Sequence, residues 1–395
     1  MPGALEGMKV LDLTRTLAGP FCTMQLADMG AEIIKIEEPT KGDETRSWPP
    51  FSEGLSSYFF SINRNKRSIA LDLKNPKGIE IIKKLAKSSD VMIESFRTGA
   101  LDRMGIGYSD IYGINPLIIY CSISGYGRTG PLKNKAGYDP MVQAYGGLMS
   151  ITGEPGRPPV RAGYSLVDLI CAWVAYSGIV TALLHRERTG EGQYLEASLL
   201  EGQVASSAYY TSTYLSTGLI PDKIGSSNPA VHPFQAYASS DGYFLLGVGN
   251  DGLWARFCEA LGRLDLLEAK EYKTNLLRVQ NKQQLNYILQ EIFSGKTTLE
   301  WLDLLDKVGV PNSPINNIEQ LVNDPQVAYR NMILNIRQPN GQEIGMPASP
   351  LKLYTTPPTY RRHVPTLGEH THEILEELGY TEDDLKGMLA SGVIK

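Results

Sequence analysis

The first 125 residues alternate between short apolar segments and longer mixed ones. The apolar segments have strand length and are found at residues 8–13, 31–36, 68–73, 91–96 and 117–124. Residues 21–29 and 76–88 lie between them and read as helices, the second with Pro76 at a favoured first position. Strands that alternate with helices predict a mainly parallel sheet covered on both faces. The fold class is therefore α/β, with a large doubly wound, Rossmann-like domain.

Residues 161–200 contain the most apolar stretch of the chain. Leu166 to Leu184 predicts a buried helix, with Asp168 in its first turn. Free backbone amides and the helix macrodipole stabilise a carboxylate there. Little free energy is therefore expected to be needed to keep Asp168 ionised as an oxygen nucleophile. The simpler interpretation of Asp168 is a helix cap or dipole partner. The stretch approaches the roughly 20 apolar residues of a membrane span, but its polar and aromatic members favour a core helix.

The second half of the chain predicts a smaller domain. Residues 201–227 are rich in Ser, Thr, Tyr and Gly, which indicates a linker. Residues 228–323 predict an α+β domain with a hairpin over 232–248 and helices near 253–261, 283–293 and 299–308. Residues 324–349 are extended and indicate a second linker, and residues 366–380 predict a capped helix. The large domain is thus expected to be discontinuous, made of residues 1–200 and 350–395.

Composition narrows the class of protein. A chain of 395 residues exceeds the usual size of one core, and 42% hydrophobic with 21% charged residues is ordinary for a globular protein. A net charge of -5 gives no reason to expect nucleic acid or a membrane as partner. Four dispersed cysteines indicate neither a disulfide framework nor a zinc site. The N-terminal sequence lacks a secretory pattern, so a cytoplasmic protein is expected.

One glycine motif needs a separate interpretation. Residues 125–130, GYGRTG, satisfy G-x-G-x-x-G directly after a predicted strand. A dinucleotide fingerprint also requires a helix that opens at the glycines, whereas Pro131 and a polar segment follow here. The sequence therefore argues against NAD or FAD and favours a loop that lines a cleft.

Asp168 belongs to a longer motif. R-x-G-x-x-x-x-D, an apolar helix and A-L-x-x-R-x-x-T-G-x-G-Q run from Arg161 to Gln193. This closely resembles the signature of the family III CoA-transferases. Further segments extend the resemblance over nearly the whole chain: LDLTRTLAGP at 11–20, GAEIIKIE at 30–37, NRNKRSIALDLK at 63–74, ESFRTGALDRMG at 94–105 and SGYGRTGP at 124–131. Within the family it is most similar to transferases that move CoA from succinyl-CoA to dicarboxylic acids.

The resemblance implies an activity and a set of site residues. Asp168 is the expected covalent nucleophile, which needs no general base because a carboxylate is already ionised at neutral pH. Coenzyme A is then a substrate, with no cofactor and no metal. An interlocked homodimer is expected, with acyl-CoA and carboxylic acids as small-molecule partners. Coenzyme A is expected to contact Leu17, Ala18, Leu71, Lys74, Arg97 and Arg103.

Other residues are assigned to the acyl end of the site. Tyr138 and Asp139 occupy positions that line the acyl pocket in relatives. Gly247 and Gly249 permit close backbone approach and are candidate amide donors to an oxyanion, although a hairpin end explains them equally well. Arg15 or Arg46 is a weak candidate for pairing with the distal carboxylate of a substrate.

Two other functions remain possible, and two residues differ from the pattern of the family that the chain resembles. α-Methylacyl-CoA racemases share this resemblance but carry a His where this chain has Tyr138, and a tyrosine is a poor base at neutral pH. A non-catalytic CoA-binding protein would be expected to lose the carboxylate that Asp168 retains. Glu38 stands where formyl-CoA transferases carry an Arg, and Thr98 replaces the common Pro. Glu38 puts one phosphate contact in doubt.

Overall fold

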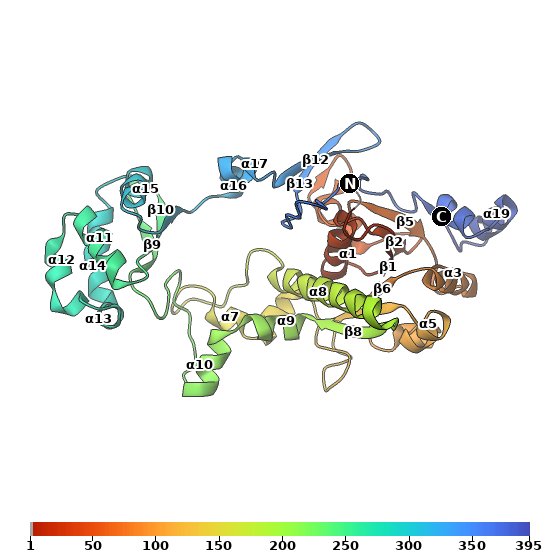
Figure 1. Cartoon of the computed structure of the whole chain (residues 1–395), viewed down its shortest axis with the longest axis horizontal. Coiled ribbons are helices and arrows are strands. Elements are labelled where there is room, and N and C mark those ends of the chain that lie inside the picture. The colour runs from red at the N-terminus through yellow and green to blue at the C-terminus, as the bar shows by residue number, and fades with distance from the viewer. Residues whose placement is uncertain (1–2) are drawn as a thin grey trace. The chain divides into compact units, whose positions relative to one another are not determined.

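The computed structural model describes residues 3–395 and divides the chain into two compact units. Unit 1 contains residues up to 148, 161–219 and 328–395, and unit 2 contains 149–160 and 220–327. The boundaries differ from those predicted, because residues 149–160 join unit 2 and residues 201–219 join unit 1. Figure 1 shows the chain in both units.

Unit 1 is built on a six-stranded parallel sheet with the order β5-β2-β1-β6-β7-β8, which confirms the predicted fold class. The chain moves outward from β1 to β5, then returns to the other side of β1 with β6. In open α/β sheets, ligands bind at the carboxyl ends of the strands beside such a reversal, here between β1 and β6. The strands are β1 (Lys9–Leu13), β2 (Glu32–Glu37), β5 (Lys66–Ala70), β6 (Val91–Glu94), β7 (Ile119–Ser124) and β8 (Gln193–Ser198).

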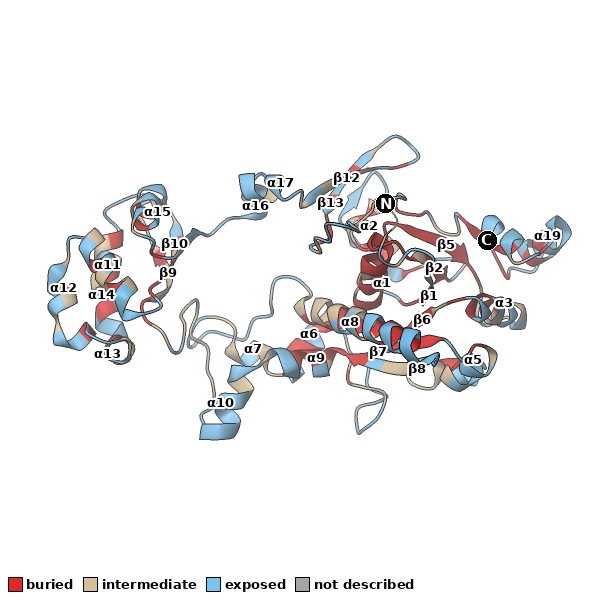
Figure 2. Cartoon of the chain, in the orientation of Figure 1, coloured by how far each residue is buried: buried red, intermediate tan, exposed pale blue. Residues whose placement is uncertain are grey.

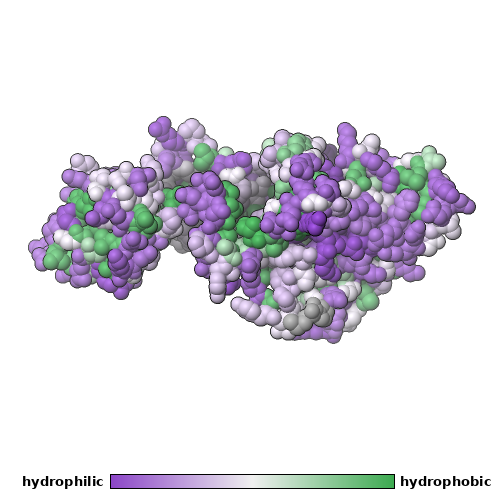
Figure 3. All heavy atoms as spheres, turned by 90° about the horizontal axis from the view of Figure 1, so that it is seen from above, coloured by the Kyte–Doolittle hydropathy of each residue, from purple (hydrophilic) through white to green (hydrophobic). Residues whose placement is uncertain are grey.

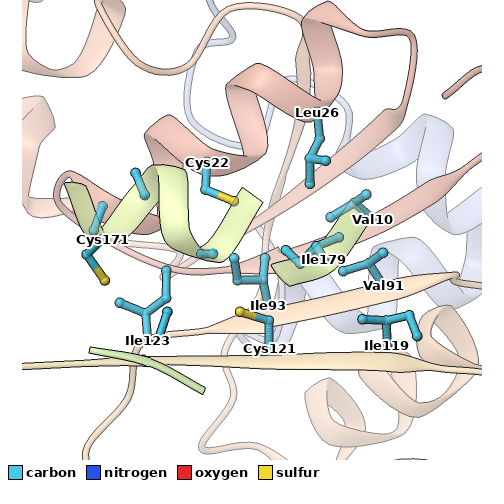
Figure 4. Close-up of a cluster of buried hydrophobic side chains, with 14 of the residues drawn as sticks. Val10, Cys22, Leu26, Val91, Ile93, Ile119, Cys121, Ile123, Cys171 and Ile179 are labelled. Atoms are coloured by element: carbon cyan, nitrogen blue, oxygen red, sulfur yellow. The ribbon is translucent and has the colours of Figure 1, made fainter. Parts of the chain in front are cut away.

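Helices cover both faces of this sheet. One face packs against α1 (Ala18–Asp28) and α8 (Leu166–Thr189), and Figure 4 shows Cys22 of α1, Cys171 of α8 and Cys121 of β7 in that core. All four cysteines are free and buried. The opposite core is formed with α3 (Pro76–Lys87), α5 (Tyr108–Ile114), α18 (Thr371–Glu377) and α19 (Glu382–Ala390). The strands are almost entirely buried between the two helical layers (Figure 2).

Helix α8 is longer than predicted and ends at Gly190, which adopts the left-handed conformation with a φ of 74°. By length and composition it is able to cross a membrane. However, residues such as Cys171, Ala175, Ile179 and Leu183 are buried against α1 and the sheet. Helix α8 therefore contributes one face to the core of unit 1, and the core helix of a soluble protein passes the same test of length and composition.

A buried, highly charged segment fixes the C-terminal residues to the sheet. Arg64 is 1% exposed and its Nη2 lies 2.6 Å from Asp28. The guanidinium of Arg67 binds Glu373 and Glu377 of α18 at 2.7 and 2.6 Å. The pairs of Arg67 hold α18 against β5, whereas the pair of Arg64 joins the residues before β5 to α1. Helix α18 starts later than predicted because Gly368 has a φ of 71°, and α19 was not predicted.

The predicted linkers contain regular structure. Residues 201–227 include most of α9 (Leu199–Ser206), whose first turn Ser198 caps by accepting from the amide of Glu201, and α10 (Tyr209–Thr217). Residues 324–349 include α17 (Pro325–Tyr329) and the antiparallel hairpin β12 (Ile333–Arg337) and β13 (Glu343–Pro347). Both predicted linkers therefore contain helices or strands, because local caps and strand pairing satisfy the backbone there.

Unit 2 contains a three-stranded antiparallel sheet, β9 (Phe234–Ala238), β10 (Tyr243–Gly247) and β11 (Asn312–Pro314), with the predicted hairpin at its centre. Its core includes Trp254, Phe257 and Phe293. The helices that surround it are α11 (Asp251–Ala260), α12 (Leu264–Glu268), α13 (Asn275–Gln280), α14 (Lys282–Phe293) and α15 (Thr298–Lys307), with a short 3-10 helix at Lys270–Tyr272.

The remaining elements are short. They are the 3-10 helix Glu44–Ser47, β3 (Phe51–Ser52), β4 (Leu55–Ser56), α2 (Ser57–Phe60), α4 (Ala100–Arg103), α6 (Asp139–Tyr145), α7 (Leu148–Ile151) and α16 (Ile318–Val322).

Candidate active site

Asp168 lies in the first turn of α8, half-buried, in unit 1. The helix has no side-chain cap from its own Ser165. Instead, the carboxylate of Asp139 in α6 accepts the amides of Val167 at 2.8 Å and Asp168 at 3.2 Å. A carboxylate from a separate helix therefore takes the place of the N-terminal cap.

Asp139 is held in turn by Gln143. Asp139 is 2% exposed, and its other oxygen accepts from Nε2 of Gln143 at 2.6 Å. The Gln143 oxygen accepts from the amide of Ala162 at 2.8 Å. Asp139 therefore organises the start of α8, whereas Tyr138, which is 52% exposed, is open to solvent. The sequence grouped both as pocket-lining residues, and the structure separates them.

The electrostatic setting of Asp168 differs from the one predicted. Burial, and then the charge of Asp139, raise the pKa of Asp168 from 3.8 to about 7. Two amides of the helix terminus stabilise Asp139 and not Asp168. The expectation that Asp168 is anionic at low cost was wrong for this reason.

A cavity of about 90 Å³ lies at the carboxyl ends of the strands near the chain reversal. It brings together Leu71 and Lys74 from the predicted CoA set and adds Arg15 and Glu38. The guanidinium of Arg15 lies 5.0 Å from the centre of the Phe96 ring. The other lining residues are Leu13, Ile36, Glu37, Asp72, Leu73 and Met104.

The carboxylate of Glu38 forms hydrogen bonds within its own loop. Its carboxylate accepts from the amides of Thr40 and Lys41 at 3.0 and 2.7 Å, and also from the Thr40 hydroxyl. The hydroxyl bond is the main reason that the pKa of Glu38 lies below its usual value. A carboxylate therefore stands at the cavity, at the position where the sequence analysis put a phosphate contact in doubt.

The remaining predicted CoA residues are distributed around this edge. Leu17 immediately precedes α1 and Ala18 begins it. Arg97 lines a second cavity of about 210 Å³, next to Thr98, whose hydroxyl donates to the Lys133 carbonyl. Arg103 is exposed at the end of α4 and lines neither cavity. Leu71 and Lys74 thus line the same cavity, whereas Arg97 lines the other one.

The glycine motif forms a loop without a helix. Residues 125–138 contain no helix, so the context that a dinucleotide fingerprint needs is missing. A Cβ added at Gly137 would lie 2.8 Å from the ring of Tyr126 and 3.1 Å from the Cα of Gly125. Gly125 and Gly137 therefore allow the two ends of the loop to come into backbone contact, and Tyr138 follows this contact.

The glycine loop of unit 2 offers fewer donors than predicted. The amide of Gly247 donates to the Pro311 carbonyl at 2.9 Å, so it is not free to stabilise an oxyanion. Gly249 is exposed and precedes Asn250, whose side chain caps α11. The proposal for Gly247 is therefore corrected: its amide belongs to the sheet.

A buried charge network that the sequence analysis did not single out joins β1, β2 and β5. Asp12 is fully buried and accepts from Thr14 and Thr23, with Lys66 at 3.2 Å. Burial alone would raise the pKa of Asp12, but Lys66 and Lys35 lower it to about 2. The available signal was a charged residue inside each apolar strand, Asp12 in VLDL and Lys35 in IIKI.

This network fixes the loop that begins α1. Lys66 donates to the Pro20 carbonyl at 2.8 Å, and Lys35 donates to the Thr14 carbonyl at 2.9 Å. The predicted CoA contacts at Leu17 and Ala18 lie between these two anchors. Within residues 3–395, no group of three or more His, Cys, Asp or Glu side chains is placed to hold a metal ion.

Comparison with known proteins identifies the family. A model of CoA-transferase family III matches residues 5–371. The succinyl-CoA:glutarate CoA-transferase of Homo sapiens is 42% identical, over 99% of this chain and 90% of its own length. The succinate–glutarate CoA-transferase of Agrobacterium fabrum is 40% identical over 95% of both chains.

A solved structure agrees with the sequence comparison. A CAIB/BAIF family protein from Brucella suis superposes with a TM-score of 0.86 at 37% identity, covering 96% of this chain and 100% of that protein. The chain therefore belongs to CoA-transferase family III, and it is a CoA-transferase.

Proposed function

We propose that the protein transfers coenzyme A from succinyl-CoA to a dicarboxylic acid through covalent intermediates on Asp168. The observation that carries the proposal is the half-buried carboxyl group of Asp168, presented by the first turn of α8 with a raised pKa. Similar relatives are named for succinyl-CoA with glutarate or mesaconate, which supports this substrate class.

The first half of the reaction loads coenzyme A onto the enzyme. A carboxylate oxygen of Asp168 bonds to the thioester carbonyl carbon, and the carbon–sulfur bond breaks to give a mixed anhydride and CoA thiolate. The thiolate then attacks the aspartyl carbonyl and releases the donor carboxylate. The product is an aspartyl-CoA thioester.

The second half repeats these steps in reverse with the acceptor. The acceptor carboxylate attacks the aspartyl thioester, releases the thiolate and forms a new anhydride. The thiolate attacks the acceptor carbonyl, which frees acyl-CoA and restores the Asp168 carboxylate. No proton is gained or lost, so the chemistry needs an ionised Asp168 but no separate base.

The raised pKa has two opposing effects on this nucleophile. With a pKa of about 7, Asp168 is only about half ionised at neutral pH. The ionised fraction is more basic and therefore more nucleophilic than an ordinary aspartate. Compared with an ordinary aspartate, a smaller fraction of Asp168 is ionised at neutral pH, but each ionised carboxylate is a stronger nucleophile.

Mass spectrometry of the loaded enzyme tests the proposal. After incubation with succinyl-CoA, the intact protein is expected to gain the mass of coenzyme A less one water, because the thioester replaces an oxygen of the Asp168 carboxyl group. Hydroxylamine should release the coenzyme A and leave a hydroxamate on the protein. Asp168→Asn should abolish the adduct, whereas Asp383→Asn, on a fully solvated side chain of α19, should leave it unchanged. An adduct that persists in Asp168→Asn would rule out covalent catalysis by this residue.

We also propose that the protein is a homodimer. Several large apolar side chains on α10 and the residues after it are exposed, which is unusual for a surface that contacts only water. These residues are Tyr209, Tyr214, Leu215, Leu219 and Ile220. Light scattering on the purified protein should give twice 43.5 kDa; the monomer mass would contradict this.

A further inference from the structure

We propose that Arg161 binds the second carboxylate of the dicarboxylic acid and so selects dicarboxylates over monocarboxylates. This inference rests on the proposed function, because it assigns the far end of the same substrate. While one carboxylate reacts at Asp168, the other carries a full charge that needs a cationic partner. A guanidinium binds a carboxylate through two parallel N–H donors, which gives both strength and orientation.

Hydrogen bonds fold the Arg161 segment back beside Asp168. The amide of Ala162, the next residue, donates to Gln143, and Gln143 donates to Asp139. Asp139 accepts from the amide of Asp168. Only two buried side chains therefore separate the amide beside Arg161 from the amide of Asp168, a separation on the order of 10 Å.

The charge of Arg161 is uncompensated. The residue is exposed, and its Nη1 makes two long contacts of 3.3 Å with the carbonyls of Ala162 and Gly163. Within residues 3–395 it forms no ion pair with a carboxylate. Five guanidinium N–H groups in a fixed fork, with a single nitrogen used, leave a free face for a carboxylate.

The two arginines considered from the sequence fit this role less well. Arg46 is bound to Glu37 through Nε at 2.8 Å and Nη2 at 2.7 Å, and its guanidinium lies over the Phe59 ring. Arg15 lines the cavity that also contains Lys74, on the expected CoA side of the site. Arg161 is instead tied to the segment that leads into Asp168.

A pair of acceptors with five carbons each tests the assignment. Glutarate carries the second carboxylate and pentanoate does not. In a ping-pong reaction, kcat/KM for the acceptor reports only the second half-reaction, so effects on the donor do not enter. Where pentanoate turns over too slowly, its inhibition constant against glutarate supplies the comparison.

Arg161→Met keeps the unbranched stem of the side chain and removes the charged guanidinium. It should lower kcat/KM for glutarate by about 30-fold or more and change the value for pentanoate by less than about threefold. Arg161→Glu should further favour 5-aminopentanoate, whose ammonium replaces the second carboxylate, over glutarate. Arg188→Met, an exposed arginine at the far end of α8, is the matched control and should change neither acceptor.

The outcomes separate this inference from the proposed function. An equal loss for both acceptors would assign Arg161 a structural role, and no loss for either would remove it from the site; each overturns the inference. A wild-type protein that forms no CoA adduct with succinyl-CoA would instead refute the proposed function.

Discussion

The carboxylate of Asp139 occupies the backbone amides that begin the helix of Asp168. It accepts the amide of Asp168 itself at 3.2 Å and the amide of Val167 at 2.8 Å. A helix terminus normally lowers the pKa of a carboxylate nearby. Here a second carboxylate takes that stabilisation, and Asp168 is left with burial and a like charge, which raise its pKa. The same helix end therefore brings together one carboxylate that accepts its amides and one carboxyl group whose pKa is raised.

The rate of enzyme loading should follow the ionisation of Asp168. Because the protonated form cannot attack, kcat/KM for succinyl-CoA should rise with pH and level off above a midpoint near 7. Asp139→Asn removes a like charge while its amide oxygen still accepts one backbone N–H. The midpoint should therefore move down by about 0.5 to 1 pH unit. A midpoint that stays in place would show that Asp139 does not act on the charge of Asp168.

Removal of the Asp168 carboxyl group should stabilise the protein at alkaline pH. The pKa of this acid is raised on folding, so the folded state binds its proton more tightly than the unfolded chain. Stability is therefore lost as pH rises from about 4 through 7, and the full cost is present above pH 7. Discounted for partial exposure, the cost is about 1 to 2 kcal/mol.

Thermal unfolding at two pH values checks this prediction. Asp168→Asn should raise Tm at pH 8 and leave it nearly unchanged at pH 4. Asp383→Asn serves as the comparison, since its carboxyl group is 95% exposed. An Asp168→Asn protein that is less stable than wild type at pH 8 would contradict the electrostatic account of the site.

Two residues of the smaller cavity should affect coenzyme A in opposite directions. Lys74→Met removes a cation beside the expected phosphates and should raise KM for succinyl-CoA by about 10-fold. Glu38→Gln removes an anion at the same cavity and should lower this KM by about two- to fivefold. Both effects should shrink with added salt, because the side chains are exposed. Changes in the same direction for both variants would place the phosphates elsewhere.

Gly137→Ala should disturb the loop ahead of Tyr138. The added methyl group would collide with the Tyr126 ring and approach the Cα of Gly125. We expect a destabilisation of about 1 to 3 kcal/mol and a fall in kcat, because α6 and Asp139 follow directly. Gly113→Ala, at an open position on α5, is the control. Unchanged unfolding and unchanged kcat would show that the loop yields without cost.

The exposure of apolar side chains at the surface cannot be read from hydropathy alone. Figure 3 shows a largely hydrophilic face with separate hydrophobic patches. A sequence reports that apolar residues such as Leu215 or Ile220 exist, but their exposure of 77% and 83% is a property of the folded chain. This exposure supports the proposed dimer, which the sequence implies only through a resemblance.

Local pattern was sufficient for most of the large unit. Strands β1, β2, β6 and β7 and helices α1 and α3 formed close to their predicted positions, because each has a clear apolar period and a capping or breaking residue. Strand β8 was missed, since QYLEAS mixes polar and apolar residues at the edge of the sheet. Helix α10 was missed because none of its residues is buried and its composition resembles a loop.

The sequence by itself indicated the parallel sheet, the apolar helix and the position of Asp168 at the start of that helix, because these follow from the length, periodicity and alternation of apolar segments along the chain. Only the tertiary structure decided the charge state of Asp168. Asp139 lies 29 residues earlier, and nothing in the spacing shows that its carboxylate binds the α8 amides. Electrostatics depends on distance in space and on burial, and both arise only when α6 packs against α8.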